Sequence, residues 1–392
     1  MNTHKLGWRN LLSNPLNTAL SLLLMTFGVG IISILLLLNN QVENQLQNNI
    51  RGIDMVVGAK GSPLQLILSS LYHVDAPTGN ISYSLAKKIT KNPLVDFGIP
   101  LSYGDSYNGF RIVGTTHQYP KLYDATIKEG RLWSAPLEVV LGSSVATINQ
   151  LDIGDDFYGT HGLIEGGHIH DNYAYKVVGT LNKTHSTIDQ LILTNTQSVW
   201  QVHNHNENTP EDPKITSMLV KFKSPIGLIQ IPRKVNETTN LQAAVPALEI
   251  SRLTNLLGFG LQSINTIAFI IIIVSGISIF ISLYNSLKQR RYELALMRVQ
   301  GATKKQLVKL VLQEGITLSL LGTIFGLIIS RKAILIMSFY VDHKNTLDNL
   351  RLNLTKEELW LFPVAALIGL LAALIPIIFV YNINIPKTLS NA

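Results

Sequence analysis

Hydrophobic residues in this chain are gathered into four long runs. The first run, residues 16–38, contains no charged residue. As a helix it would reach about 34 Å, enough to cross the hydrocarbon core of a bilayer. Residues 258–287 and 359–381 form similar runs, and a shorter run at residues 315–330 needs a helix that begins near Leu307. We therefore predict four membrane-spanning helices, at residues 16–40, 258–287, 307–330 and 359–381.

The segments between these runs are very unequal in length. Residues 41–257 form one long segment, whereas residues 288–306 and 331–358 are short. Short loops rich in Lys and Arg stay in the cytoplasm. The loop at 288–306 contains one acid, Glu293, and six cations: Lys288, Arg290, Arg291, Arg298, Lys304 and Lys305. We therefore place this loop, the N-terminal residues 1–15 and a tail at residues 382–392 in the cytoplasm.

The same rule places the long segment outside the cytoplasm and makes residues 331–358 an outer loop. Arg331 and Lys332 are then on the unexpected side of the membrane. Two explanations remain open: their side chains extend to the outer interface, or the third helix is longer than its apolar run.

The long segment mixes helical and strand patterns. Val42, Leu46 and Ile50 recur every four residues, so the first spanning helix is expected to continue outward as a stalk, and residues 246–258 predict a returning helix. Short helices are predicted at 82–91 and 143–151, and strands at 110–114, 138–141, 175–179, 190–193 and 217–222. The predicted fold class is a membrane α+β protein, with four transmembrane helices and a large extracytoplasmic α+β domain between helices 1 and 2.

Composition and charge narrow the class of protein. Charged residues make up 15% and hydrophobic residues 46% of the 392 residues, whereas soluble proteins have about 25% charged residues. The net charge of +7 is largely explained by the cytoplasmic loops, so no nucleic-acid partner is expected. There is no cysteine, which excludes disulfides, thiol catalysis and Cys-ligated metals. No phosphate-binding GxxxxGK(S/T) loop, HExxH or GxSxG motif is present, so we expect no enzyme activity of its own.

The cytoplasmic loop is the most specific segment. Its sequence KQRRYELALMRVQGA, at residues 288–302, is followed by Glu314 and Gly315, and Gly301 could supply a turn with positive φ. This pattern resembles the FtsX/MacB-like permeases of ABC transporters. Residues 8–15 resemble the N-terminal amphipathic helix of this family, which implies such a helix at residues 1–15. Further resemblances are matches to a MacB-like periplasmic core domain at 142–146, 151–155 and 177–179, and Pro386 after the last span.

The resemblance implies a stand-alone permease without a fused ATPase, in the bacterial inner membrane. It implies mechanotransmission, in which a separate cytoplasmic ATPase that binds ATP and Mg²⁺ moves the periplasmic domain. Expected partners are that ATPase, a second identical permease, membrane lipid and a periplasmic substrate-binding or adaptor protein. We assign ATPase coupling to Arg290, Arg291, Glu293, Arg298, Gly301 and Lys304. The alternatives are an FtsX-like regulator that activates an extracytoplasmic partner such as a cell-wall hydrolase, a zinc-linked transport component and a membrane-anchored metal sensor.

Two further patterns in the long segment could bind ligands. His168 with His170, and His203 with His205, are H-x-H pairs whose rings could reach one Zn²⁺ from an extended chain; the alternative is a set of polar surface residues. Residues 55–68 contain two glycines and Lys60, which could form an anion-binding backbone nest. The alternative is a loop and short apolar helix packed at the base of the domain.

Overall fold

The computed structural model describes residues 3–13, 15–162, 169–203, 212–340 and 354–381. It divides into two compact units, a membrane unit made of residues 1–42 and 257–392, and a domain made of residues 43–256. Two long helices, α2 (Pro15–Ile50) and α9 (Pro246–Gln289), each begin in one unit and end in the other. The helical stalk predicted after the first span and the returning helix are therefore continuous with spanning helices.

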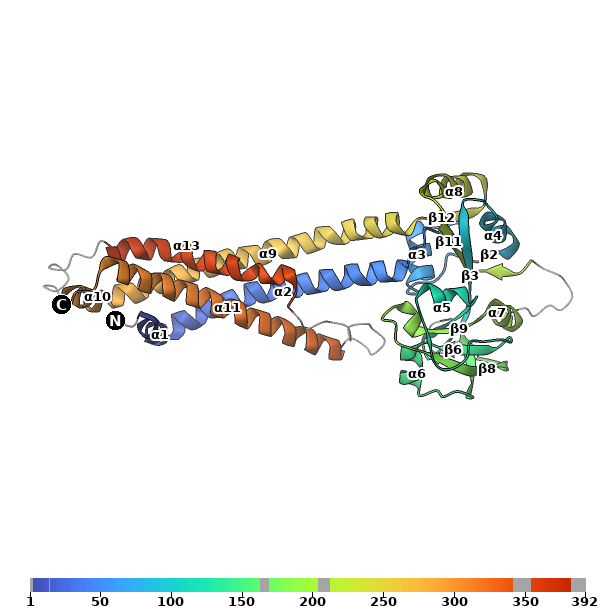
Figure 1. Cartoon of the computed structure of the whole chain (residues 1–392), viewed down its shortest axis with the longest axis horizontal. Coiled ribbons are helices and arrows are strands. Elements are labelled where there is room, and N and C mark those ends of the chain that lie inside the picture. Colours follow the sequence, from blue (N-terminus) through green and yellow to red (C-terminus); the bar gives the residue numbers. More distant parts are fainter. Residues whose placement is uncertain (1–2, 14, 163–168, 204–211, 341–353, 382–392) are drawn as a thin grey trace. The chain divides into compact units, whose positions relative to one another are not determined.

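The membrane unit is a helical bundle (Figure 1). Four described helices are long and apolar enough to cross a membrane, at Pro15–Gln41, Gln262–Gln289, Lys304–Met337 and Lys356–Tyr381. Besides α2 and α9, the elements of this unit are α1 (Thr3–Ser13), α10 (Arg291–Val299), α11 (Lys304–Tyr340), α12 (Lys356–Leu359) and α13 (Leu361–Tyr381).

Helix α11 corrects the predicted third span. It begins at Lys304 and continues to Tyr340, whereas the hydrophobic run predicted 307–330. The apolar run is shorter than the helix, because Arg331 interrupts the apolar pattern without ending the helix. The predicted outer loop therefore does not start at residue 331. Of the two explanations offered for Arg331, the longer helix is the one that the structure supports.

Small residues allow α11 and α13 to pack closely. A Cβ atom added to Gly369 of α13 would lie 2.5 Å from Ser319 Oγ and 2.6 Å from the carbonyl oxygen of Gly315, both on α11. Similarly, a Cβ atom on Gly326 of α11 would lie 2.9 Å from the carbonyl oxygen of Thr26 on α2. Close backbone approach at small residues is the usual basis of helix association in membranes, where burial of apolar surface gives no advantage over lipid.

The domain is built on a mixed sheet (Figure 1). Its strand order is β12-β1-β11-β3-β4-β9-β6-β8-β5, and β7 pairs with both β3 and β8. The strands are β1 (Met55–Ala59), β2 (Ile81–Ser82), β3 (Val95–Tyr107), β4 (Phe110–Thr115), β5 (Ile127–Gly130), β6 (Glu138–Leu141), β7 (Asp156–His161), β8 (Ile169–Leu181), β9 (Leu191–Asn195), β10 (Lys214–Ile215), β11 (Ser217–Phe222) and β12 (Leu241–Ala244). The predicted α+β class and the five predicted strands are confirmed.

Pairing closes part of this sheet into a ring. Strand β3 joins β4, β4 joins β9, β9 joins β6, β6 joins β8, and β8 returns through β7 to β3. Alternate residues of these strands form one apolar core cluster, which includes Phe110, Ile112, Val139, Leu141 and Tyr175. The first half of β3 instead pairs with β11, so this long strand belongs to both parts of the sheet.

Short helices complete the domain. They are α3 (Pro63–Leu71), α4 (Tyr83–Thr90), α5 (Gln118–Leu122), α6 (Ser143–Asn149), the 3-10 helix η1 (Thr187–Gln190), α7 (Thr196–His203) and α8 (Pro225–Thr238). Residues 55–59, predicted as a loop, form the buried strand β1, and α3 is the predicted short apolar helix. Lys60 Nζ donates to the carbonyl oxygens of Asn236 and Leu241, at 2.9 and 3.4 Å. These contacts support the packing alternative over the anion nest.

Candidate functional site

The segment between α9 and α11 is a short helix held between two turns. A single residue, Arg290, separates α9 from α10, and Gly301 follows α10 with a φ of +96°. Only glycine adopts that φ readily, so the positive φ predicted for Gly301 is confirmed. Thr303 then starts α11: its N–H donates to Gln306 Oε1 at 2.8 Å, and its hydroxyl accepts from the Gln306 N–H at 3.3 Å. This reciprocal pair is a capping box, which fixes where α11 begins.

Arg290 connects an exposed acid to a buried one. Its Nε lies 3.0 Å from Glu293 Oε2, and its Nη1 lies 3.9 Å from Glu314 Oε1. The Glu314 side chain is 2% exposed, and it also accepts a hydrogen bond from Asn10 Nδ2 of α1. Three helices of the membrane unit, α1, α10 and α11, are therefore linked by these side chains beside the α9–α10 turn. A charge at this depth is stable only with such partners.

The remaining predicted coupling residues hold α10 in place. Arg298 Nη1 donates to the Ala302 carbonyl oxygen at 3.1 Å, across the turn that contains Gly301. Arg291 and Lys304 instead lie over aromatic rings of α13, with the Arg291 Cζ 6.0 Å from the Phe379 ring centroid and Lys304 Nζ 4.0 Å from that of Tyr381. Such cation–π contacts stabilise by about 0.5–1 kcal/mol at exposed sites. The structure thus brings all six predicted coupling residues to one end of the membrane unit.

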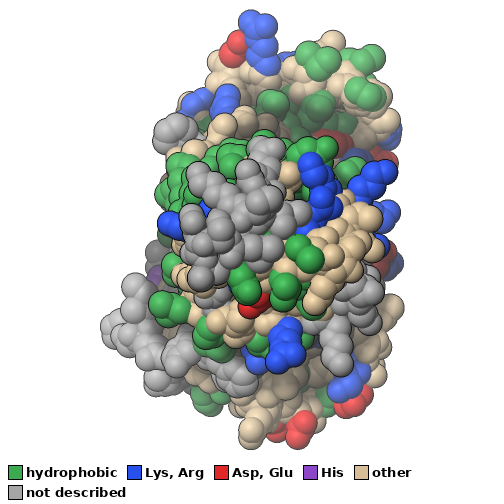
Figure 2. All heavy atoms as spheres, turned by 90° about the vertical axis from the view of Figure 1, so that its left-hand side faces the viewer, with side chains coloured by type: hydrophobic (Ala, Val, Ile, Leu, Met, Phe, Trp, Pro, Cys, Tyr) green, Lys and Arg blue, Asp and Glu red, His purple; other side chains and the backbone are tan. Residues whose placement is uncertain are grey.

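An apolar surface on α10 was missed in the sequence. Leu294 and Ala295 face the bundle and are buried, whereas Tyr292, Leu296 and Val299 are 48%, 41% and 61% exposed. Their spacing of four and then three residues places the three side chains on one helix face. In the end-on view, hydrophobic side chains are exposed beside Lys and Arg side chains (Figure 2). The i, i+4, i+7 spacing was readable in the sequence, but Leu294 and Ala295 offer a second apolar face, so the sequence alone did not show which face is free.

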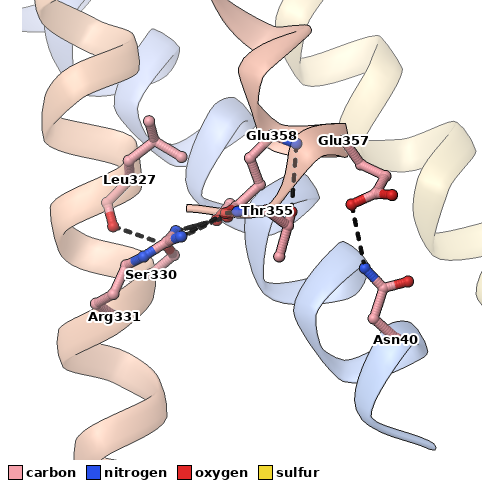
Figure 3. Close-up of polar contacts among 8 residues, drawn as sticks. Asn40, Leu327, Ser330, Arg331, Thr355, Glu357 and Glu358 are labelled. Atoms are coloured by element: carbon pink, nitrogen blue, oxygen red, sulfur yellow. Dashed lines mark hydrogen bonds and ion pairs between the residues drawn. The ribbon is translucent and has the colours of Figure 1, made fainter. Parts of the chain in front are cut away.

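A second polar cluster lies near the far end of α11. Arg331 and Glu358 form an ion pair in which both guanidinium Nη atoms donate to the carboxylate, with Nη1 2.6 Å from Oε1 (Figure 3). Ser33 of α2 accepts from Arg331 Nη1 at 2.8 Å and donates to Glu358. The Glu358 side chain is fully buried and Arg331 is 14% exposed. This cluster explains the unexpected Arg331: its charge is neutralised inside the bundle.

The turn that carries Glu358 is fixed by its own hydrogen bonds. The Glu358 N–H donates to Thr355 Oγ1 at 3.4 Å, and the Thr355 N–H donates to Glu358 Oε2 at 3.0 Å. Next to it, Asn40 Nδ2 of α2 donates to Glu357 Oε2 at 3.5 Å (Figure 3). The carboxylate that receives Arg331 is therefore also oriented by a hydrogen bond from the backbone of its own turn.

The predicted H-x-H pairs are only partly within the described residues. His168 and His205 lie outside them, and His170 is in strand β8, but its side chain also lies outside them. His203 ends helix α7, and its Nε2 is 3.2 Å from Oδ1 of Asp105. The structure therefore groups His203 with a carboxylate that the sequence did not connect to it.

Comparison with known proteins gives two family matches. The family model of the MacB-like periplasmic core domain matches residues 18–238, and that of the FtsX-like permease C-terminal region matches residues 265–385. Two curated relatives are the pyoverdine export ATP-binding/permease proteins PvdT of Pseudomonas savastanoi pv. phaseolicola (strain 1448A / Race 6) and Pseudomonas syringae pv. tomato (strain ATCC BAA-871 / DC3000). Each is 21% identical, over 83% of this chain and 50% of the relative. The chain thus spans about half the length of these relatives.

Two solved structures also show similarity. The periplasmic region of MacB from Actinobacillus actinomycetemcomitans is 15% identical with a TM-score of 0.35, over 54% of this chain and 98% of that one. The extracellular domain of the ABC-type transporter YknZ from Gram-positive bacteria is 9% identical with a TM-score of 0.32, over 48% of this chain and 98% of that one.

Proposed function

The chain belongs to the MacB/FtsX-like permeases of ABC transporters, and we propose that it couples ATP hydrolysis in a separate cytoplasmic subunit to movement of its periplasmic domain. It is a multi-pass inner-membrane protein whose MacB-like domain is periplasmic. The observation that carries the coupling proposal is helix α10, which presents a free apolar face among cations at the end of the membrane unit that the basic loop places in the cytoplasm.

Helix α10 has the features of a docking element. Tyr292, Leu296 and Val299 form an apolar strip of the kind that inserts into a groove of a partner. Arg291 and Lys304 beside it add positive charge, which favours an acidic rim around that groove. The helix is short and held at both ends, because Arg290 contacts Glu314 of α11 at one end and Arg298 closes the turn at the other. A displacement of α10 by a bound partner would therefore move the adjacent helices, because no flexible segment lies between them and α10.

Two chain connections would carry that movement outward. Helix α9 runs without a break from Pro246 in the domain to Gln289, which directly precedes the α10 turn. Helix α2 runs from Pro15, next to α1, to Ile50 in the domain. Since Asn10 of α1 and Arg290 both contact Glu314, the cytoplasmic ends of both connections are linked. ATP and Mg²⁺ would act in the ATPase, and we expect two copies of the permease, one for each ATPase subunit.

Substitutions on the free face of α10 test this function. A tagged chain is purified from its native membrane, and the co-purified proteins are identified by mass spectrometry. We expect an ABC ATPase subunit to accompany the unchanged chain, and Tyr292→Asp with Leu296→Asp to reduce it at least fivefold, because carboxylates cannot enter an apolar groove. The matched control is Leu354→Asp, since Leu354 is 54% exposed and lies near α12 at the other end of the bundle. An ATPase retained in full by the double variant would show that α10 does not dock it, and no ATPase with the unchanged chain would contradict the function itself.

A further inference from the structure

Asp105, His161 and His203 converge on one point in the periplasmic domain. Asp105 Oδ1 lies 3.2 Å from His203 Nε2 and 3.9 Å from His161 Nδ1. One donor atom from each of the three residues lies within 4.8 Å of the other two. The three residues come from β3, β7 and α7, so the chain assembles this point from distant parts of its sequence.

The fold aims these side chains at one another. Asp105 and His161 are directly paired across the antiparallel strands β3 and β7, where side chains lie on the same face about 4.5–5.5 Å apart at Cβ. The pairing of β3 with β4 is irregular between Tyr103 and Ser106, which is a bulge of the kind that redirects a side chain. Helix α7 ends at His203, so the third imidazole is brought in from outside the sheet.

Two glycines make room for this arrangement. A Cβ atom on Gly104 would lie 2.0 Å from His203 Nε2, and one on Gly159 would lie 3.0 Å from Asp105 Oδ2. Any side chain at Gly104 would therefore displace the His203 ring from the carboxylate. The space around the three donor atoms depends on both positions lacking a side chain.

The carboxylate of Asp105 is held in place. Its side chain is 1% exposed, and Tyr175 Oη donates to the second oxygen, Oδ2, at 3.4 Å. The His203 and His161 side chains are 27% and 62% exposed, so the site opens on the His161 side. Two imidazole rings, with centroids 5.4 Å apart, therefore face the same carboxylate oxygen.

We infer that Asp105, His161 and His203 bind a divalent transition-metal ion of the Zn²⁺ class. Neutral imidazole nitrogens and one carboxylate oxygen are ligands that Zn²⁺ accepts. Ligand atoms at about 2.0–2.1 Å from a tetrahedral ion lie about 3.3 Å apart. The 3.2 Å separation of His203 Nε2 and Asp105 Oδ1 matches this spacing, whereas His161 Nδ1 is 3.9 Å from Asp105 Oδ1, so the His161 ring has to move inward when the ion binds.

The three ligands found among the described residues occupy three of the four positions of a tetrahedral ion. Zinc sites of this kind keep a fourth position for water or for a donor atom of a bound molecule. The exposed His161 side gives such a molecule access. The inference is independent of ATPase coupling, because it rests on residues of the periplasmic domain alone.

Zn²⁺ binding to the full-length protein tests the site. The detergent-purified chain is treated with a chelator and titrated with ZnCl₂ in a calorimeter. We expect saturable binding, weakened at least tenfold by Asp105→Asn and by His203→Asn. His185→Asn is the matched control, because His185 is an exposed histidine of the same domain with a positive φ that Asn tolerates, and it should bind as the unchanged protein does.

A second readout separates loss of the site from loss of folding. Zn²⁺ should raise the melting temperature of the unchanged protein and of His185→Asn, but not that of Asp105→Asn or His203→Asn, each of which should still melt cooperatively without metal. Absence of saturable binding to the unchanged protein would overturn the inference. So would binding that changes less than twofold in both variants, or that is lost only when His168 and His170 are replaced.

Discussion

Arg331 of α11 and Glu358 of α12 form a bidentate ion pair across the segment that joins them, and Ser33 of α2 contacts both side chains. One buried charge pair therefore ties three helices at the periplasmic end of the membrane unit. We predict that Arg331→Met lowers the free energy of unfolding by roughly 3–5 kcal/mol, because it leaves the buried carboxylate without its cation. Denaturation of the detergent-purified protein measures this change.

The double variant Arg331→Met with Glu358→Leu serves as the control for that experiment. It removes both charges, so no unpaired charge remains, and it should be clearly more stable than either single variant. Equal losses in the single and double variants would show that packing, not charge, ties these helices together.

A second prediction concerns the contact between α11 and α13. Gly369→Ala places a Cβ atom 2.5 Å from Ser319 Oγ and 2.6 Å from the Gly315 carbonyl oxygen, so the helices must separate. We expect a loss of about 1–3 kcal/mol in the free energy of unfolding. The same substitution at Gly260 of α9, where no atom lies within 4 Å of the added Cβ, should be neutral or stabilising because Ala favours helix. If both variants behave alike, close backbone approach at Gly369 is not important for stability.

The third prediction concerns the turn after α10. Gly301 has a φ of +96° and no atom within 4 Å of an added Cβ, so a substitution there strains the backbone without a steric clash. Gly301→Val should introduce roughly 1–3 kcal/mol of strain and reduce the ATPase activity of the assembled complex several-fold. Gly301→Asn should reduce it less, since Asn tolerates positive φ better than a β-branched residue. The same loss in both variants would point to the side chain rather than to the backbone.

The sequence predicted the parts of this protein whose signals are local. Apolar runs marked the spanning helices, and alternating apolar residues marked strands such as β4 and β11. Gly301 could be assigned a positive φ because a turn is required between two helices. The full length of α11 could not be predicted, because the charge of Arg331 ends the apolar run. Only the structure shows that Glu358 neutralises this charge.

Features that depend on contacts between distant segments could not be predicted from the sequence. Residues 55–59 were expected to lie in a loop, yet they form strand β1, which is paired on both sides and buried. The grouping of Asp105 with His161 and His203 depends on a strand register and a bulge between distant segments. Spacing along the chain favoured His203 with His205, since only near neighbours can be compared without a fold. The free face of α10 likewise became visible only when the packed face was known.

The last prediction concerns His73, a buried histidine in the periplasmic domain. Its Nε2 and Nδ1 are hydrogen-bonded to the hydroxyls of Tyr119 and Tyr103, at 2.8 and 2.9 Å, so both ring nitrogens already have partners inside the domain. Burial, followed by the charge of Arg111, lowers the pKa of His73 to about 3. Its ordinary pKa in the unfolded chain is about 6.5.

Because the pKa of His73 is lower in the folded state, its neutral form contributes stability that is fully present above about pH 6.5. Between pH 6.5 and 3 the unfolded chain takes up a proton that the folded chain does not, so stability falls as the pH falls. The loss from this residue should be about 1 kcal/mol between pH 6.5 and 5.5, from the limiting slope of about 1.4 kcal/mol per pH unit. Denaturation of the full-length protein at both pH values measures it, with His73→Asn as the reference.

That variant is less stable at every pH because it loses the tyrosine contacts, but its stability should fall less over this interval, whereas the exposed His185→Asn should keep the full pH dependence. An unchanged pH dependence in His73→Asn would show that His73 has the same pKa in the folded and unfolded protein.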